Sequence, residues 1–348
     1  MRVLIFDPLT ARPYDDASLA REPLGGTEAT VIRVARAIDA QVMQYHRASP
    51  SGRYIPIDGG VKPTHVISLR HPGAAVAMRA EFPDAVHVLW MHDLMGPDLA
   101  TAFRKYGREL ARTETVAVCV SDFHVGHVRQ ALNELLPGSP PLELRRVYNP
   151  IDEDLAPDGT GFDGNTLIYF SSPNKGLQIA LQTFAVMHER EPSLRLKVAN
   201  PGYFAMPDIT AEGITVLGSL PHGEVKTHVR TALASFIPNF VYPETFGLVL
   251  AESNALGTPV IAHPYGAAAE VLGDPRQIVP LPVDRSATTL AGLYLSRIEE
   301  WRNGHRPAVV ARPEFRTGNV AAAWLALLAE LDERRVGASP ECHILRAN

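Results

Sequence analysis

The chain has 348 residues, 46% of them hydrophobic and 20% charged, with a formal net charge of −5 at pH 7. This length and balance suit two globular domains, and the negative charge argues against a general nucleic-acid binder, which needs a basic face for phosphates. No apolar run approaches the roughly 20 residues of a membrane-spanning helix. We therefore expect no nucleic-acid partner and no transmembrane segment, and we leave peripheral contact with a membrane open.

The cysteines and the N-terminus indicate a cytoplasmic location. Cys119 and Cys342 are the two cysteines of the chain, too few for a disulfide framework. Met1 is followed almost at once by the strand-like run 3–6, which is too short for the apolar region of a signal peptide.

Short β-branched runs alternate with helical patterns through the first 150 residues, which predicts a parallel sheet with crossover helices. Strands are expected at 3–6, 41–45, 65–69, 87–91, 116–120 and 144–148. The segment 149–165 is rich in Pro, Gly and Asp without apolar periodicity, which is typical of a linker.

A second α/β series begins after this linker. Strands are expected at 167–170, 194–198, 214–217, 235–237, 259–262 and 278–281, and helices at 175–189, 224–232, 247–256 and 288–301. A last helix over 319–335 carries an apolar stripe centred on Trp324. The sequence therefore predicts two doubly wound domains, 1–150 and 151–315, followed by a C-terminal segment 316–348.

Ligands of open parallel sheets bind beyond the carboxyl ends of the strands. His92 follows a predicted strand of the first domain, and the polar loop 171–176 follows the first strand of the second. For any single residue, the start of an ordinary polar loop is the simpler interpretation. The density of polar residues at the strand ends of both halves nevertheless predicts a ligand site.

The most informative stretch runs from Pro243 to Val260 and opens a helix. Thr245 is expected to cap this helix, which would leave the amides of Phe246, Gly247 and Leu248 free to meet an anion or hydroxyl groups. Gly247 allows a ligand to approach the backbone closely.

Two carboxylates lie on this stretch, Glu244 before the helix and Glu252 on its otherwise apolar body. Helical rise separates them by roughly 10–12 Å, about the distance from a donor sugar across a diphosphate to a ribose. Two alternatives stay open. Glu252 would pair with a buried arginine, or Glu244 would simply favour the helix dipole.

These residues resemble the pattern of family-4 glycosyltransferases of GT-B fold, in which two glutamates are separated by seven residues and Phe-Gly follows the first. Here the pattern is Glu244, Phe246-Gly247 and Glu252. The pair Gly25-Gly26 resembles the family's glycine loop, and His92 matches a histidine found beside the donor sugar. Further matches, at Val120-Ser121-Asp122, at Tyr148–Asp152 and at Gly266–Val271, extend the resemblance over nearly the whole chain.

The resemblance implies a GT-B fold with two Rossmann-like domains facing across a cleft, the first on the acceptor side and the second binding the nucleotide-sugar. It implies a retaining, metal-independent hexosyltransferase of the kind used in polysaccharide biosynthesis, with no cofactor, since the nucleotide-sugar is a substrate. The acceptor would be a glycan, a lipid-linked molecule or a small molecule. Domain closure around the donor is expected, with the last helix returning to the first domain.

The site residues follow from the same resemblance. The catalytic residues would be His92, Glu244 and Lys175. The donor would be bound by Gly25, Gly26, Ser171, Ser172, Asn174, Lys175, Thr245, Phe246, Gly247, Leu248 and Glu252. Glu244 would accept hydrogen bonds from the sugar, Glu252 would bind the ribose, and no metal ligand is expected because no Asp-x-Asp stands directly at the end of a predicted strand.

The chain departs from the family at one position. An arginine usually precedes the Lys-Gly pair by a few residues, and here that position falls on Phe170 or the adjacent serines. The segment Ser171-Ser172-Pro173-Asn174-Lys175 resembles the corresponding sequence of a family subgroup, in which Ser-Ser-Pro precedes Lys-Gly or Arg-Gly.

Three rival functions were weighed. A dehydrogenase is disfavoured, because Asp7-Pro8-Leu9 follows the first strand where a Gly-x-Gly-x-x-Gly turn would be needed. A glycosidase using Glu244 and Glu252 is disfavoured by the helical position of Glu252 and by the two-sheet architecture. A non-catalytic GT-B relative that binds nucleotide or glycan stays open because of the absent arginine.

Overall fold

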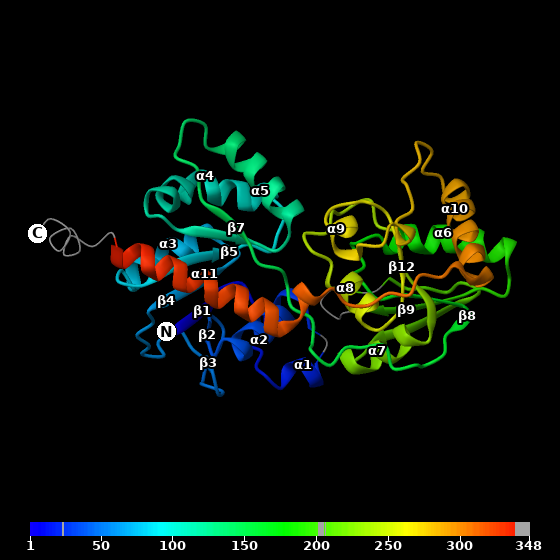
Figure 1. Ribbon diagram of the computed structural model, residues 1–348, viewed down its shortest axis with the longest axis horizontal. Coiled ribbons are helices and arrows are strands. Elements are labelled where there is room, and N and C mark those ends of the chain that lie inside the picture. The colour runs from blue at the N-terminus through cyan, green and yellow to red at the C-terminus, as the bar shows by residue number, and fades with distance from the viewer. Residues whose placement is uncertain (23, 201–204, 206, 338–348) are drawn as a thin grey trace, which may run out of the picture. The chain divides into compact units, whose positions relative to one another are not determined.

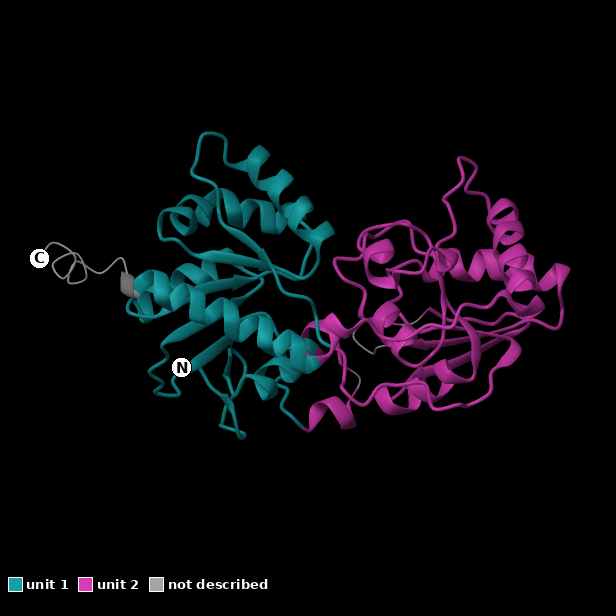
Figure 2. Cartoon of the chain, viewed as in Figure 1, with its two compact units in different colours: residues 1–16, 30–150, 317–348 teal, residues 17–29, 151–316 magenta. Residues whose placement is uncertain are grey.

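The computed structural model describes residues 1–22, 24–200, 205 and 207–337, so Cys342 lies outside the described residues (Figure 1). The chain divides into two compact units (Figure 2). Unit 1 contains residues 1–16, 30–150 and the chain from 317 onward, and unit 2 contains 17–29 and 151–316. The segment 17–29, which the sequence assigned to the first domain, thus groups with the second.

Unit 1 is built on a seven-stranded sheet in the order β3-β2-β1-β4-β5-β6-β7, with every neighbouring pair parallel. Its strands are β1 (Val3–Asp7), β2 (Gln41–Gln44), β3 (Tyr54–Ile55), β4 (His65–Leu69), β5 (Val86–Trp90), β6 (Val116–Cys119) and β7 (Leu144–Arg146). The central strands β1, β4, β5 and β6 are buried at every position. Burial on both faces explains why they appear in the sequence as nearly continuous apolar runs.

Helices cover both faces of this sheet. They are α2 (Gly26–Ala37), which begins in unit 2, then α3 (Pro72–Glu81), α4 (Pro97–Arg112), α5 (Asp122–Leu135) and α11 (Thr317–Gly337). Leu89 of β5 packs in one cluster with Phe103 of α4 and Val128 of α5. The next residue, Trp90, contacts Trp324 of α11. Because successive side chains of a strand point to opposite faces, α11 covers the face away from α4 and α5.

Unit 2 is built on a five-stranded parallel sheet in the order β10-β9-β8-β11-β12. Its strands are β8 (Asp163–Tyr169), β9 (Arg195–Asn200), β10 (Ile214–Ser219), β11 (Ala232–Ile237) and β12 (Val260–Ala262). Its helices are α1 (Ser18–Arg21), α6 (Leu177–Arg190), α7 (His222–Arg230), α8 (Leu248–Ala255), α9 (Ala268–Leu272) and α10 (Ala287–Glu300). In both units the chain winds outward from a central strand in two directions, so the predicted doubly wound sheets are confirmed.

Two predicted details of the sheets are wrong. Residues 278–281 form no strand; the segment makes one isolated bridge, between Ala262 and Ile278. Pro280 and Pro282 explain this, since proline has no amide to donate to a ladder. Conversely, the short edge strand β3 was missed because two residues carry no periodic signal. None of the described helices has the length and apolarity needed to cross a membrane.

Candidate functional site

The loop after β8 carries the predicted phosphate-binding residues of unit 2. The phenol of Tyr169 donates hydrogen bonds to the carbonyls of Ser172 at 2.7 Å and Lys175 at 3.2 Å, which holds the loop in a tight turn. The Ser172 hydroxyl donates to Asn174 Oδ1 at 2.6 Å, and Ser171 is buried beside it. The loop is therefore shaped by its own contacts before α6 begins.

Lys175 and Glu244 meet at the carboxyl edge of this sheet. Lys175 Nζ lies 2.7 Å from Glu244 Oε2, and the Glu244 side chain is 5% exposed. Glu244 Oε1 is buried and has no hydrogen-bond partner in the described part of the chain. One oxygen of this carboxylate is thus neutralised by a cation, while the other can accept a hydrogen bond from a ligand hydroxyl.

The backbone of Glu244 is fixed by the segment that follows β12. Ala267 N donates to Glu244 O at 2.8 Å, and Glu244 forms a parallel bridge with Gly266. A Cβ on Gly266, whose φ is +69°, would lie 2.4 Å from both the amide nitrogen and the carbonyl oxygen of Glu244. The glycine recognised in the sequence is therefore required for contact between two backbone segments.

The start of α8 differs from the prediction in its cap. Thr245 does not cap the helix: the N-cap is Gly247, with φ 94° and ψ 66°, and no side chain accepts a hydrogen bond there. A Cβ on Gly247 would also lie 2.8 Å from Leu250 Cδ1. Left-handed backbone at Gly247 thus takes the place of a side-chain cap at the start of α8. Phe246 is buried against Phe315, so its ring supports the loop.

The pair Gly25-Gly26 lies beside this helix start. Gly26 opens α2, and a Cβ on it would approach Leu248 Cδ1 to 3.1 Å. Both glycines and Leu248 belong to unit 2. The structure thus brings Gly26, at the start of α2, beside Leu248, at the start of α8.

Glu252 lies one turn further along α8 and has a partner that sequence reasoning missed. Its Oε2 is 3.1 Å from Nε2 of His222, the first residue of α7, and its side chain is 5% exposed. A histidine thus contacts Glu252, where the sequence interpretation considered a buried arginine. No spacing rule links positions 222 and 252, which explains why no sequence pattern indicates the contact.

His92 is described within unit 1, after β5. It is buried, its ring centroid lies 4.7 Å from that of Trp90, and its Nε2 has no hydrogen-bond partner among the described residues. Burial lowers the pKa of His92 to about 3, so the ring is neutral at pH 7. Next to it, Asp93 makes a double hydrogen bond with Arg70 at 2.6 and 2.9 Å. Burial raises the pKa of Asp93, but the hydrogen bonds and charge of the Arg70 guanidinium lower it more. The pKa of Asp93 therefore lies below its usual value.

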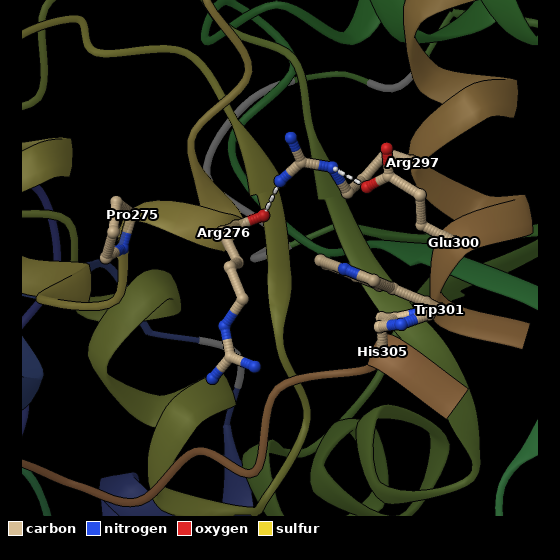
Figure 3. A pocket seen from close by; sticks show the side chains of 6 residues that line it. All are labelled: Pro275, Arg276, Arg297, Glu300, Trp301 and His305. Carbon is tan, nitrogen blue, oxygen red and sulfur yellow. Dashed lines mark hydrogen bonds and ion pairs between the residues drawn. The ribbon is translucent and has the colours of Figure 1, made fainter. Parts of the chain in front are cut away.

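A separate pocket of about 260 Å³ opens beside α10 in unit 2, and contains none of the predicted site residues (Figure 3). It is lined by Pro275, Arg276, Arg297, Glu300, Trp301 and His305. Arg297 is paired with Glu300 and Arg276 with Asp274, so its arginines are already neutralised. Among the residues that the structure describes, no group of three or more His, Cys, Asp or Glu side chains is placed to hold a metal ion.

Comparison with known proteins places this geometry in context. Residues 170–280 match the family Glycosyl transferases group 1. The matched region begins directly after β8 and includes Lys175, Glu244 and Glu252, whereas Gly25, Gly26 and His92 lie outside it.

Curated relatives match part of the chain. The phosphatidyl-myo-inositol mannosyltransferases of Mycobacterium tuberculosis and Mycobacterium bovis are each 28% identical over 152 residues. This alignment spans 41% of the present chain and 40% of the relative. The chain thus matches about two fifths of the length of these relatives.

Solved structures match much more of the chain at low identity. HepE of Anabaena, in complex with UDP and glucose, has a TM-score of 0.68 at 16% identity, covering 95% of this chain and 100% of that one. Sucrose-phosphate synthase from Thermosynechococcus elongatus has a TM-score of 0.66 at 13% identity, covering 97% and 100%. The predicted fold class, two Rossmann-like α/β domains of the GT-B kind, is confirmed.

Proposed function

We propose that the chain is a retaining glycosyltransferase that takes a sugar from a nucleotide-sugar donor and works without a metal ion. The observation that carries this proposal is the Glu244 carboxylate, with Oε2 held by Lys175 and Oε1 buried without a partner among the described residues. A buried acceptor of this kind needs a donor, and sugar hydroxyls supply one. The family match over residues 170–280 supports the same assignment.

Other residues of unit 2 would each bind a different part of the donor. Lys175, with the Ser172-Asn174 turn, lies where it would hold the diphosphate, together with the amides at Gly25-Gly26 and at the start of α8. Glu252 would accept hydrogen bonds from the ribose hydroxyls. These groups place positive potential where the leaving diphosphate develops charge, which is electrostatic stabilisation by a preorganised site.

In this proposal a phosphate oxygen of the donor accepts the acceptor's proton, so no protein nucleophile is needed. His92, being neutral, would orient the donor sugar and would not carry the proton. A glycan, a lipid-linked molecule or a small molecule would serve as acceptor. The mannosyltransferases named above act on phosphatidyl-myo-inositol by their names, and HepE was solved with UDP and glucose; both support a nucleotide-sugar enzyme.

Calorimetry tests the proposal on the full chain with UDP, GDP and ADP. One of these nucleotides should bind, and Glu252→Gln should weaken that binding by about 1.5–3 kcal/mol, the range for a hydrogen bond to a charged group. The corresponding UDP- or GDP-sugar should be hydrolysed slowly when no acceptor is present. Absence of binding by all three nucleotides would overturn the proposal.

A second function is favoured by one observation. The position where the family carries an arginine falls here on Phe170 or the adjacent Ser171 and Ser172, all of them buried, so one fixed cation for the diphosphate is absent. A non-catalytic relative would bind nucleotide without turnover. Tight nucleotide binding with no hydrolysis or transfer from a panel of nucleotide-sugars would select this alternative.

A further inference from the structure

His222 and Glu252 come from two helices that flank one strand. His222 is the first residue of α7, which precedes β11, and Glu252 lies in the middle of α8, which follows β11. The two side chains approach to 3.1 Å between Nε2 and Oε2. His222 is 29% exposed, whereas Glu252 is 5% exposed. His222 is therefore partly exposed to solvent, whereas the Glu252 carboxylate that it contacts is buried.

The direction of this hydrogen bond follows from the chemistry of the two groups. An ionised carboxylate can only accept, so Nε2 of His222 carries the hydrogen and donates it. A carboxylate is planar, and fixing one oxygen limits the rotation of the whole group. The contact with His222 is therefore one restraint on the plane of the Glu252 carboxylate.

We propose that His222 is a positioning residue that holds the Glu252 carboxylate in the orientation needed to accept both hydroxyls of the donor ribose. This inference rests on the proposed function, in which Glu252 binds the ribose. A cis-diol presents two hydroxyl donors at a fixed spacing. Its recognition therefore depends more strongly on the plane of the carboxylate than the recognition of a single hydroxyl does. Loss of His222 should therefore reduce discrimination between a ribose and a 2′-deoxyribose.

The test compares two substitutions with different chemistry. His222→Phe keeps a ring of similar size and removes the donor, whereas His222→Gln keeps an N–H donor on a flexible side chain. His228→Phe, at the other end of α7, is the matched control, since it makes the same replacement away from Glu252. Thermal melts of all three variants establish that they fold.

Calorimetry then measures each protein with UDP, GDP, ADP and their 2′-deoxy forms. Wild type and His228→Phe should bind the preferred ribonucleotide about 10- to 100-fold more tightly than its 2′-deoxy form. His222→Phe should lose most of this ratio, and His222→Gln should retain more of it. In a Glu252→Ala background, His222→Phe should change the ratio no further, because the group that His222 positions is absent.

Two results would overturn the inference, and they are distinguishable. If wild type discriminates between the two sugars and His222→Phe discriminates equally well, His222 does not position Glu252, while the proposed function stands. If wild type binds none of UDP, GDP and ADP, or binds its preferred nucleotide without regard to the 2′-hydroxyl, the ribose assignment of Glu252 fails and this inference fails with it.

Discussion

Lys175 Nζ and Glu244 Oε2 lie 2.7 Å apart, although the two residues are separated by 69 positions in the chain. Their proximity is a direct result of sheet order. Lys175 follows β8 and Glu244 follows β11, and these strands are parallel neighbours. Their loops therefore leave the sheet at the same edge, where a donor would need both a cation for its phosphates and an acceptor for its sugar.

Replacing Lys175 by alanine should lower the rate of donor hydrolysis about 100-fold, the usual effect of removing one preorganised charge from a reaction site. The change also leaves a buried Glu244 carboxylate without its cation, which should reduce the free energy of unfolding by about 1–3 kcal/mol. Lys226→Ala is the matched control, since its Nζ lies 2.8 Å from Asp152 with exposures of 20% and 21%. Hydrolysis that falls equally in both variants, or in neither, would contradict the assignment of Lys175.

Gly266→Ala should damage the site through the backbone of Glu244. The new Cβ would lie 2.4 Å from two backbone atoms of Glu244, and a non-glycine residue at φ +69° adds about 1–2 kcal/mol of strain. Gly218→Ala isolates the backbone strain from the steric clash, because Gly218 has φ +72° and a Cβ placed on it would meet nothing within 4 Å. Urea denaturation and nucleotide binding should show both stability and affinity lost in Gly266→Ala. Gly218→Ala should lose stability alone, and equal behaviour of the two variants would argue against the backbone contact.

The rule that ligands bind at the carboxyl ends of parallel strands singled out the Lys175 loop, and the glutamate spacing singled out Glu244 and Glu252. The structure brings Lys175 and Glu244 into contact, and the role of these three residues in binding a donor remains a prediction. The contact between Glu252 and His222 was not predictable, because His222 starts a helix in a segment with no recognisable motif. Physical contact here depends on the packing of α7 against β11 and α8, which apolar patterns locate only to within a turn.

Two further differences have local causes. Thr245 was assigned as a cap from residue preference, but Gly247 enters the left-handed region and ends the loop without a side-chain cap. The segment 17–29 was assigned to the first domain from its place in the chain, whereas its contacts, such as that of Gly26 with Leu248, group it with unit 2. The position of this segment in the chain does not indicate that it groups with a unit whose other residues come later in the sequence.

Burial of His92 should make the stability of the protein depend on pH. The pKa of His92 is lowered by burial to about 3, below the ordinary value of 6.5. Above pH 6.5 the folded and unfolded states both carry a neutral ring, so its contribution is constant. As pH falls from 6.5 toward 3, the unfolded state takes up a proton that the folded state excludes, and stability is lost.

The expected slope for this one group is about 1.4 kcal/mol per pH unit within that window. His92→Gln should remove the contribution of His92 to the pH dependence of stability. Wild type should therefore lose more stability than the variant as the pH is lowered from 7 to 5, and the difference in unfolding free energy between them should shrink. Urea denaturation at pH 7, 6 and 5 measures it. A difference that does not change with pH would show that the ring is protonated in the folded protein as well.

Metal independence remains a prediction. Lys175 and the backbone amides are expected to take the place of a divalent cation beside the diphosphate. Donor hydrolysis should therefore be unchanged after dialysis against EDTA and unaffected by added Mg²⁺ or Mn²⁺. Activity that EDTA abolishes and either ion restores would show that the phosphates need a metal bridge.

The helix α11 should be essential to unit 1, and Trp324 is the residue that tests it. Its ring is fully buried, with its centroid 4.8 Å from that of Trp90 and the two planes at 69°, an edge-to-face arrangement. Trp324→Ala should lower the free energy of unfolding by about 3–5 kcal/mol, because it removes a large apolar surface and leaves a cavity against β5. Leu325→Ala, at the next position and 40% exposed, should change it by less than about 1 kcal/mol.

Near-ultraviolet circular dichroism adds a readout specific to the ring pair. Because Trp90 and Trp324 are held in one fixed arrangement, the variant should lose part of the aromatic signal at temperatures where its far-ultraviolet spectrum is unchanged. A full aromatic signal together with a stability loss below about 1 kcal/mol would mean that the ring is not packed as described. The chain leaves unit 1 at Pro150 and rejoins it at Thr317. A confirmed loss would therefore show that the core of unit 1 is completed only by residues that follow unit 2 in the sequence.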